Sequence, residues 1–223
     1  MTNDSPFILG IDLGTSGVRI AIINNKNCLI YSSSSKYSIS FKRCDDWKKS
    51  CTELIKKIPI ELKKDLVACS VDGTSGTLMA CRENGDAIGE AIPYFSASKR
   101  TKELLGKEFP NKTNFFNLYS SIPRAMELID LYGGNILLRH QADWISGWLL
   151  NNWEFGEAGN NIRLGWDLVN QSWVSLVLDL SIQEKLPRTL ASGSSFGFIS
   201  KVRAKELELP QNLEIIAGTT DSN

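Results

Sequence analysis

The hydrophobic pattern of the first 75 residues changes from that of a sheet to that of a helix and back. Phe7–Leu13 is an almost unbroken apolar run, typical of a buried strand, and two more strands are predicted at residues 18–23 and 28–33. Apolar side chains then recur at helical spacing over residues 47–58, before another buried strand at residues 66–71. This order predicts an α/β fold, a mixed sheet with helices on both faces.

The second half of the chain continues the alternation of strands and helices. The sequence Glu-Asn-Gly-Asp at residues 83–86 is a strong signal for a β-hairpin between two short apolar segments. Pro123 in a first helical turn and two glycines after residue 132 bound a helix. The predicted elements are strands at 77–82 and 87–92, helices at 99–106, 123–132 and 141–150, an ordered loop at 153–173 and a strand at 214–217.

Charge and composition exclude several classes of protein. The 25 basic and 25 acidic side chains cancel, which argues against a general nucleic-acid binder. The apolar stretches are too short to cross a bilayer, and the N-terminus has no basic segment of the signal-peptide type. Five cysteines, an odd number without C-x-x-C spacing, fit a reducing compartment. We therefore expect a cytoplasmic protein without a nucleic-acid or membrane partner.

Three Gly-rich turns carry the candidate chemistry, and each contains an aspartate near the end of a buried strand. We call them the first turn (residues 12–17), the second turn (residues 72–76) and the third turn (residues 218–221). Glycines let backbone N–H groups approach phosphate oxygens, and a carboxylate can hold Mg²⁺ or accept a proton. One such turn is more often a simple loop, but three together favour a ligand site.

Two common nucleotide-binding motifs are missing from these turns. No Gly-Lys-Ser/Thr follows a four-residue spacer, which disfavours a P-loop NTPase. No G-x-G-x-x-G opens a helix after the first strand, which disfavours a Rossmann dehydrogenase.

The segment at residues 10–19, Gly-Ile-Asp-Leu-Gly-Thr-Ser-Gly-Val-Arg, resembles the first phosphate motif of the FGGY carbohydrate kinases, in the actin/hexokinase/Hsp70 superfamily. Six further segments resemble that family in the same order: 71–76, 140–144, 159–167, 186–187, 192–194 and 217–221. Two of these segments look closest to the cyanobacterial and plastid D-ribulose kinase branch: Asp-Gly-Thr-Ser-Gly-Thr, which begins at residue 72, and His-Gln-Ala-Asp-Trp, which begins at residue 140. The resemblance implies a ribonuclease H-like domain of the actin/hexokinase ATPase type.

The resemblance also implies roles for individual residues. Asp221 would be the general base that receives the proton of the sugar hydroxyl, and Asp12 would organise Mg²⁺ and the transferring phosphoryl group. Thr15, Ser16 and Arg19 would contact the phosphates of ATP. The residues implied to line the sugar pocket are Asp72, Thr74, Ser75 and Gly76.

Members of this family have a second actin-like domain with the adenosine pocket, and the resemblance implies that residues 1–223 lack it. We therefore expect the sugar-binding half of an ATP-dependent ketopentose kinase, with D-ribulose as the first candidate. A xylulose- or glycerol-type kinase, or a one-domain module that binds a sugar or a partner without catalysis, are the alternatives. Apolar surface exposed near residues 219–223 is expected to favour a homodimer.

Overall fold

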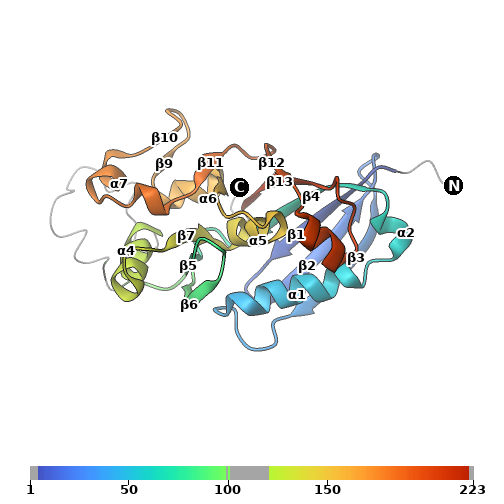
Figure 1. Cartoon of the computed structure of the whole chain (residues 1–223), viewed down its shortest axis with the longest axis horizontal. Helices are drawn as coiled ribbons and strands as arrows, with labels where there is room; N and C mark the ends of the chain where they lie inside the picture. Colours follow the sequence, from blue (N-terminus) through green and yellow to red (C-terminus); the bar gives the residue numbers. More distant parts are fainter. Residues whose placement is uncertain (1–4, 99, 101–120, 221–223) are drawn as a thin grey trace.

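A mixed sheet runs through the part of the chain that the computed structural model describes, residues 5–98, 100 and 121–220. Within these residues it has six strands in the order β12-β13-β4-β1-β2-β3 (Figure 1). The three central strands β13, β4 and β1 are parallel, and the others are antiparallel to their neighbours. The strands are β1 (Phe7–Leu13), β2 (Gly17–Ile23), β3 (Leu29–Lys36), β4 (Leu66–Gly73), β12 (Ser195–Phe198) and β13 (Glu214–Thr220).

Three helices cover one face of this sheet. They are α1 (Cys44–Lys56), α5 (Gln141–Leu150) and α8 (Lys201–Leu207), which pack on alternate residues of the strands to form the larger core. The predicted α/β class and mixed sheet are confirmed. The sequence predicted helices on both faces, whereas the helices of the described residues cover only this one. We call the other side, which presents Ile8, Gly10, Asp12, Ala21 and Ser70, the uncovered face.

A smaller three-stranded sheet adjoins the main one and has its own core. Its strands are β6 (Ala87–Ile92), β5 (Leu78–Cys81) and β7 (Leu137–His140), with helix α4 (Ser121–Tyr132) packed against them. The predicted hairpin is confirmed, with Gly85 at φ +83° in its turn. A β-carbon there would lie 2.0 Å from the ring of Trp153, so both the backbone and the packing require glycine.

Short elements fill the remainder of the described chain. The predictions at 123–132 and 141–150 are confirmed by α4 and α5, but 153–173 is not a simple loop, and β7, β12 and α8 had no prediction. The predicted helix at 99–106 lies outside the described residues, apart from residue 100. The short elements are α2 (Ile60–Lys63), β8 (Phe155–Glu157), α6 (Ala158–Asn161), η1 (Ile162–Leu164), β9 (Trp166–Asp167), β10 (Ser172–Trp173), α7 (Ser175–Asp179), η2 (Gln183–Lys185) and β11 (Arg188–Leu190).

All five cysteines are free thiols, and only Cys28 is exposed. Burial raises the pKa of Cys44 and of Cys69 to about 12 and that of Cys81 to about 11, so these thiols stay protonated and unreactive at neutral pH. Among the described residues, no helix has the length and apolar character needed to traverse a bilayer.

Candidate active site

Asp12 and Asp72 lie side by side on neighbouring parallel strands. They are paired in register between β1 and β4, each one residue before the end of its strand, so they belong to the strands themselves and not to the turns that follow. Both line a hollow on the uncovered face. Ile11 and Val71, one position earlier, point into the core, because successive side chains of a strand alternate between the two faces.

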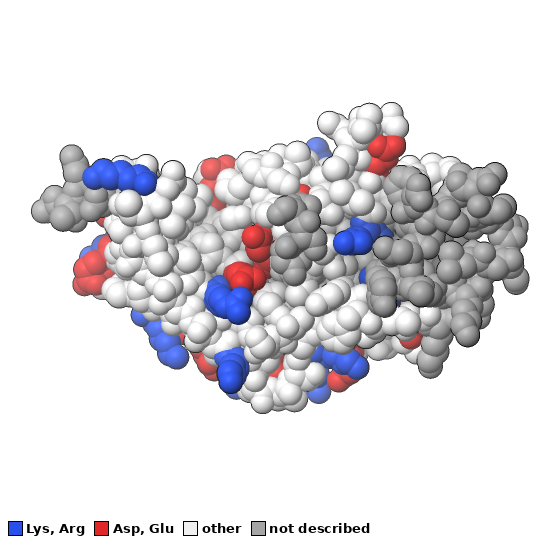
Figure 2. Space-filling view, turned by 180° about the vertical axis from the view of Figure 1, so that it is seen from behind, with Lys and Arg blue, Asp and Glu red and all other residues white. Residues whose placement is uncertain are grey.

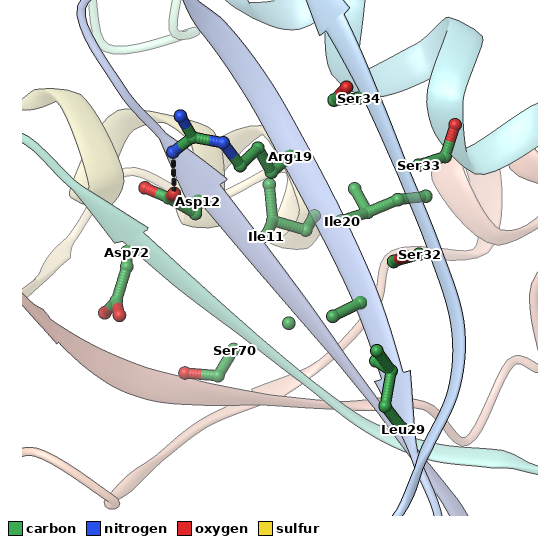
Figure 3. Close-up of a pocket in the computed structure, with 12 residues that line it drawn as sticks. Ile11, Asp12, Arg19, Ile20, Leu29, Ser32, Ser33, Ser34, Ser70 and Asp72 are labelled. Carbon is green, nitrogen blue, oxygen red and sulfur yellow. Dashed lines mark hydrogen bonds and ion pairs between the residues drawn. The ribbon is translucent and has the colours of Figure 1, made fainter.

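The hollow beside the two aspartates has a volume of about 630 Å³ and extends over β4, β1, β2 and β3 (Figure 3). The hollow exists because the strands that form its floor carry small residues there, including Gly10, Ala21 and Ser70. Seen from behind, acidic and basic side chains meet at the centre of this side of the molecule (Figure 2). The arrangement leaves room for a ligand directly against the strands.

Arg19 on β2 pairs with Asp12 across the strand boundary. Its Nη1 lies 3.0 Å from Oδ2 of Asp12, and the side chains are 68% and 48% exposed respectively (Figure 3). Two opposite charges held together yet open to solvent can contact both a cation and a phosphate. The structure therefore brings together Asp12, which the resemblance assigned to Mg²⁺ and the transferring phosphoryl group, and Arg19, which it assigned to the phosphates of ATP.

Asp72 is tied to the last strand of the sheet. Its Oδ1 accepts a hydrogen bond of 2.6 Å from the backbone N–H of Thr219 in β13. This contact fastens the start of the third turn to β4. Asp72 lies with Asp12 on the uncovered face, and the resemblance also implied a place for Asp72 in the sugar pocket. Asp221, the predicted base, lies outside the described residues.

The first turn exposes both of its predicted phosphate contacts. Thr15 and Ser16 are exposed between β1 and β2, where the N–H of Gly14 bonds the carbonyl of Gly17 at 3.0 Å. Ser16 and Arg19 also line a second hollow of about 250 Å³. Hydroxyl and backbone donors at an open Gly-rich turn suit a phosphate ligand.

The second turn is held by hydrogen bonds to its own neighbours. The Thr74 side chain is buried, and its hydroxyl lies 2.7 Å from Oγ1 of Thr77 and 2.9 Å from Oε1 of Gln141. Thr74 therefore supports the turn. Ser75 Oγ accepts a hydrogen bond of 3.2 Å from Nε of Arg163 in η1.

Gly76 completes the second turn in a left-handed conformation, at φ +85°. A β-carbon at this position would lie 3.2 Å from Nη2 of Arg124, so glycine lets that guanidinium approach the turn. Burial, with the positive charge of Arg163 nearby, lowers the pKa of Arg124 to about 10. The sequence predicted a role for neither arginine, because both lie 48 or more residues from the turn in the chain.

A buried polar cluster lies behind the second turn, at the start of α5. Oδ1 of Asp143 accepts a hydrogen bond of 2.9 Å from the N–H of Glu157, which itself caps α6. Burial raises the pKa of Asp143 to about 8 and, together with the charge of Arg124, lowers the pKa of His140 to about 3. At neutral pH both groups are therefore mainly uncharged.

Comparisons with known proteins relate this geometry to a family. No family model matches the chain. A curated xylulose kinase from Lactococcus lactis subsp. lactis (strain IL1403) is 23% identical over 240 residues, covering 97% of this chain and 48% of the relative. The solved xylulose kinase from Rhodospirillum rubrum has a TM-score of 0.84 at 14% identity, covering 97% of this chain and 49% of that one.

The Plasmodium falciparum glycerol kinase with ADP has a TM-score of 0.81 at 16% identity, covering 97% of this chain and 48% of that one. The chain has the fold of the N-terminal half of an FGGY carbohydrate kinase. The FGGY-type fold confirms the predicted actin/hexokinase ATPase class. The chain spans about half the length of the curated relative it matches, and these three kinases are named for xylulose and glycerol.

Proposed function

We propose that this chain is the sugar-side half of an ATP-dependent carbohydrate kinase that phosphorylates a hydroxyl of a ketopentose or related sugar. The observation that carries the proposal is the pairing of Asp12 with Asp72 on the uncovered face, beside the exposed first turn and Arg19. D-ribulose is our first candidate because the amino-acid sequence of the second turn resembles that of D-ribulose kinases. The names of the relatives make xylulose and glycerol the substrates to compare with it.

The residues on the uncovered face fit a metal–nucleotide complex. The Asp12 carboxylate is half-exposed at a hollow of about 630 Å³, and carboxylate oxygens are preferred ligands of Mg²⁺. Bound Mg²⁺ would neutralise negative charge on the phosphates. Arg19 and the donors of Thr15 and Ser16 would orient the phosphate oxygens. In this proposal Asp221, two residues after Thr219 in the sequence, accepts the proton of the sugar hydroxyl.

A second domain, outside residues 1–223, is proposed to supply the adenosine pocket. The relatives are about twice as long as the matched region, which supports this division of labour. We also propose that the enzyme works in the cytoplasm, since its five thiols are free. Dimerisation through surface near residues 219–223 is a separate prediction that light scattering would test.

The proposed base can be tested by substitution in the complete enzyme. Asp221→Asn keeps the size of the side chain but cannot accept a proton at neutral pH, so we expect kcat to fall by about 10²–10⁴-fold. Asp12→Asn should produce a loss that Mg²⁺ titration partly restores, because it weakens positioning of the metal. Asp179→Asn, an exposed carboxylate on α7, is the matched control and should leave kcat unchanged.

The assay would follow ADP formation with D-ribulose, D-xylulose and glycerol in parallel. Near-normal turnover by Asp221→Asn would mean that the assigned base is wrong and would make Asp72 the next residue to test. If the parent protein binds a sugar but turns over none, the non-catalytic binding module replaces the kinase.

A further inference from the structure

Tyr37 holds the first turn at two points. Its backbone N–H donates to the carbonyl of Ser16 at 3.3 Å, and its hydroxyl donates to the carbonyl of Gly14 at 2.9 Å. Tyr37 lies directly after β3, the edge strand beside β2. Both bonds end on backbone atoms, so they fix the path of the turn itself rather than one of its side chains.

Gln141 holds the second turn from the start of α5. Its Oε1 accepts hydrogen bonds from the backbone N–H of Thr74 at 3.2 Å and from the Thr74 hydroxyl at 2.9 Å. Its own backbone N–H donates to the carbonyl of Thr77 at 3.3 Å. Gly73 allows this approach, because a β-carbon there would lie 3.2 Å from the backbone nitrogen of Ala142.

The two holding residues meet each other. Nε2 of Gln141 donates to the Tyr37 hydroxyl at 3.5 Å, a long hydrogen bond between residues 104 positions apart in the sequence. Gln141 is fully buried and Tyr37 is half-buried. Burial raises the pKa of Tyr37 above its usual range, so its hydroxyl keeps the proton that it donates to Gly14.

We propose that Tyr37 and Gln141 are positioning residues that fix the first turn relative to the second turn. A continuous chain of hydrogen bonds runs from the carbonyl of Gly14 through both side chains to Thr74. The inference rests on the proposed function, in which the first turn holds phosphate and the second turn holds sugar.

Phosphoryl transfer depends mainly on positioning of the reacting groups, so the spacing of these turns matters most in the transition state. Misplacement by about 1 Å can cost about 10²-fold in rate. Removal of the link should therefore lower kcat more than it raises either KM.

The first experiment needs no activity and uses hydrogen–deuterium exchange on the whole chain. Tyr37→Phe removes one hydroxyl that bonds both Gly14 and Gln141. We expect exchange to accelerate by about 10-fold in peptides of the first turn and also at Thr74 in the second turn. Tyr31→Phe is the matched control, since Tyr31 lies on β3, the strand that Tyr37 follows, and its hydroxyl lies 3.5 Å from the carbonyl of Lys57; it should change neither turn.

Acceleration confined to the first turn would overturn the proposal, because Tyr37 would then be a local brace. Should Tyr37→Phe fail to fold, Gln141→Met breaks the same link from the other side. This variant should accelerate exchange in the first turn, which Gln141 reaches through the hydroxyl of Tyr37. Unchanged exchange there would likewise overturn the link.

The second experiment measures kinetics in the complete enzyme. Tyr37→Phe should lower kcat by about 10-fold while both KM values change by less than about 2-fold, and Tyr31→Phe should match the parent. The double variant Tyr37→Phe/Gln141→Met should be no slower than the slower single variant, because both break one link. Multiplicative losses would overturn the coupling. A parent without kinase activity would refute the proposed function, while the exchange experiment would still decide the link.

Discussion

The two faces of the six-stranded sheet are built from the same strands and have opposite properties. On the covered face, Leu9, Ile20 and Val71 are buried against helices. On the uncovered face, one position away on the same strands, Gly10 and Ser70 line an open hollow. Alternation along a strand thus separates a surface that stabilises the fold from a surface that is free to carry chemistry.

The carboxyl groups on the two sides of the sheet also differ in their exposure to solvent. Asp143, in a helix of the covered face, is buried, and its pKa is raised to about 8. Asp12, on the uncovered face, is half-exposed and paired with Arg19. We infer that stability and its pH dependence reside mainly on the covered side, whereas charge available to a ligand resides on the uncovered side.

The largest expected effect on stability is from truncation on the covered face. Leu9→Ala should lower the free energy of unfolding by about 3 kcal/mol, because Leu9 is 0% exposed and its removal leaves a cavity. Ile8→Ala is the matched variant on the adjacent position, where the side chain is 40% exposed, and should cost at most about 1 kcal/mol. Urea denaturation measures both. Equal costs would remove the distinction between the faces.

The next effect is a loss of stability at alkaline pH. The pKa of Asp143 is raised from 3.8 to about 8, so the folded chain retains a proton that the unfolded chain loses, and stability falls as pH rises between these values. The pKa of His140 is lowered from 6.5 to about 3, so its contribution makes stability fall as pH drops from 6.5 towards 3. The two slopes oppose each other between about pH 4 and 6.5.

We therefore expect the free energy of unfolding to stay level over that range and to fall by about 1.4 kcal/mol per pH unit from about pH 6.5 to 8. Asp143→Asn should abolish the alkaline fall and keep the acid one, as measured by urea denaturation at half-unit pH steps. A parent chain whose stability is level from pH 6.5 to 8 would contradict the buried, protonated state of Asp143.

A smaller effect is expected for the ion pair on the uncovered face. Arg19→Gln should change the free energy of unfolding by less than about 1 kcal/mol, because the pair with Asp12 is exposed and solvated. The same variant should impair phosphate binding in the complete enzyme. Thermal unfolding and a nucleotide-binding assay on one preparation separate the two. A loss of several kcal/mol would assign Arg19 to the stability of the fold instead.

The smallest effect should come from Gly10→Ala. A β-carbon at Gly10 meets only the carbonyl oxygen of Ala21, at 3.9 Å, which is ordinary contact. Stability should therefore change by less than about 0.5 kcal/mol. Gly218→Ala is the contrasting variant, because its β-carbon would lie 2.2 Å from the carbonyl oxygen of Val71. Equal melting temperatures for the two variants would contradict the conclusion that a β-carbon fits at Gly10 and not at Gly218.

Local patterns predicted most of the main sheet, because the hydrophobic pattern of a buried strand or an amphipathic helix lies within one continuous stretch of sequence. The strand at Phe7–Leu13, the hairpin and α5 follow from such patterns. The four-residue strands β7 and β12 do not, because they are too short to display a period. The sequence did not predict which face of the sheet stays uncovered. That depends on the face against which the connecting helices pack, and no local sequence pattern indicates it.

The candidate site divides in the same way. The aspartates and glycines of the turns were predicted because several chemical groups occur together within six residues. The sequence did not predict a role at the site for four further residues, because each reaches a turn from a distant element: Tyr37, Gln141, Arg124 and Arg163. Asp72 was predicted in a turn, whereas the structure places it in β4, because the end of a strand and the start of a turn look alike in sequence.

The position of β13 has a consequence for how the chain is made. This strand, residues 214–220, inserts between β4 and the short strand β12, so the sheet is completed by a segment that is synthesised well over 100 residues after β4. Until then, β4 presents an open edge to the rest of the cell, a template for unwanted strand pairing. Contacts between β4 and β13 also close a loop of well over 100 residues, which slows folding. A nascent chain of this protein should therefore depend on chaperones until β13 has left the ribosome.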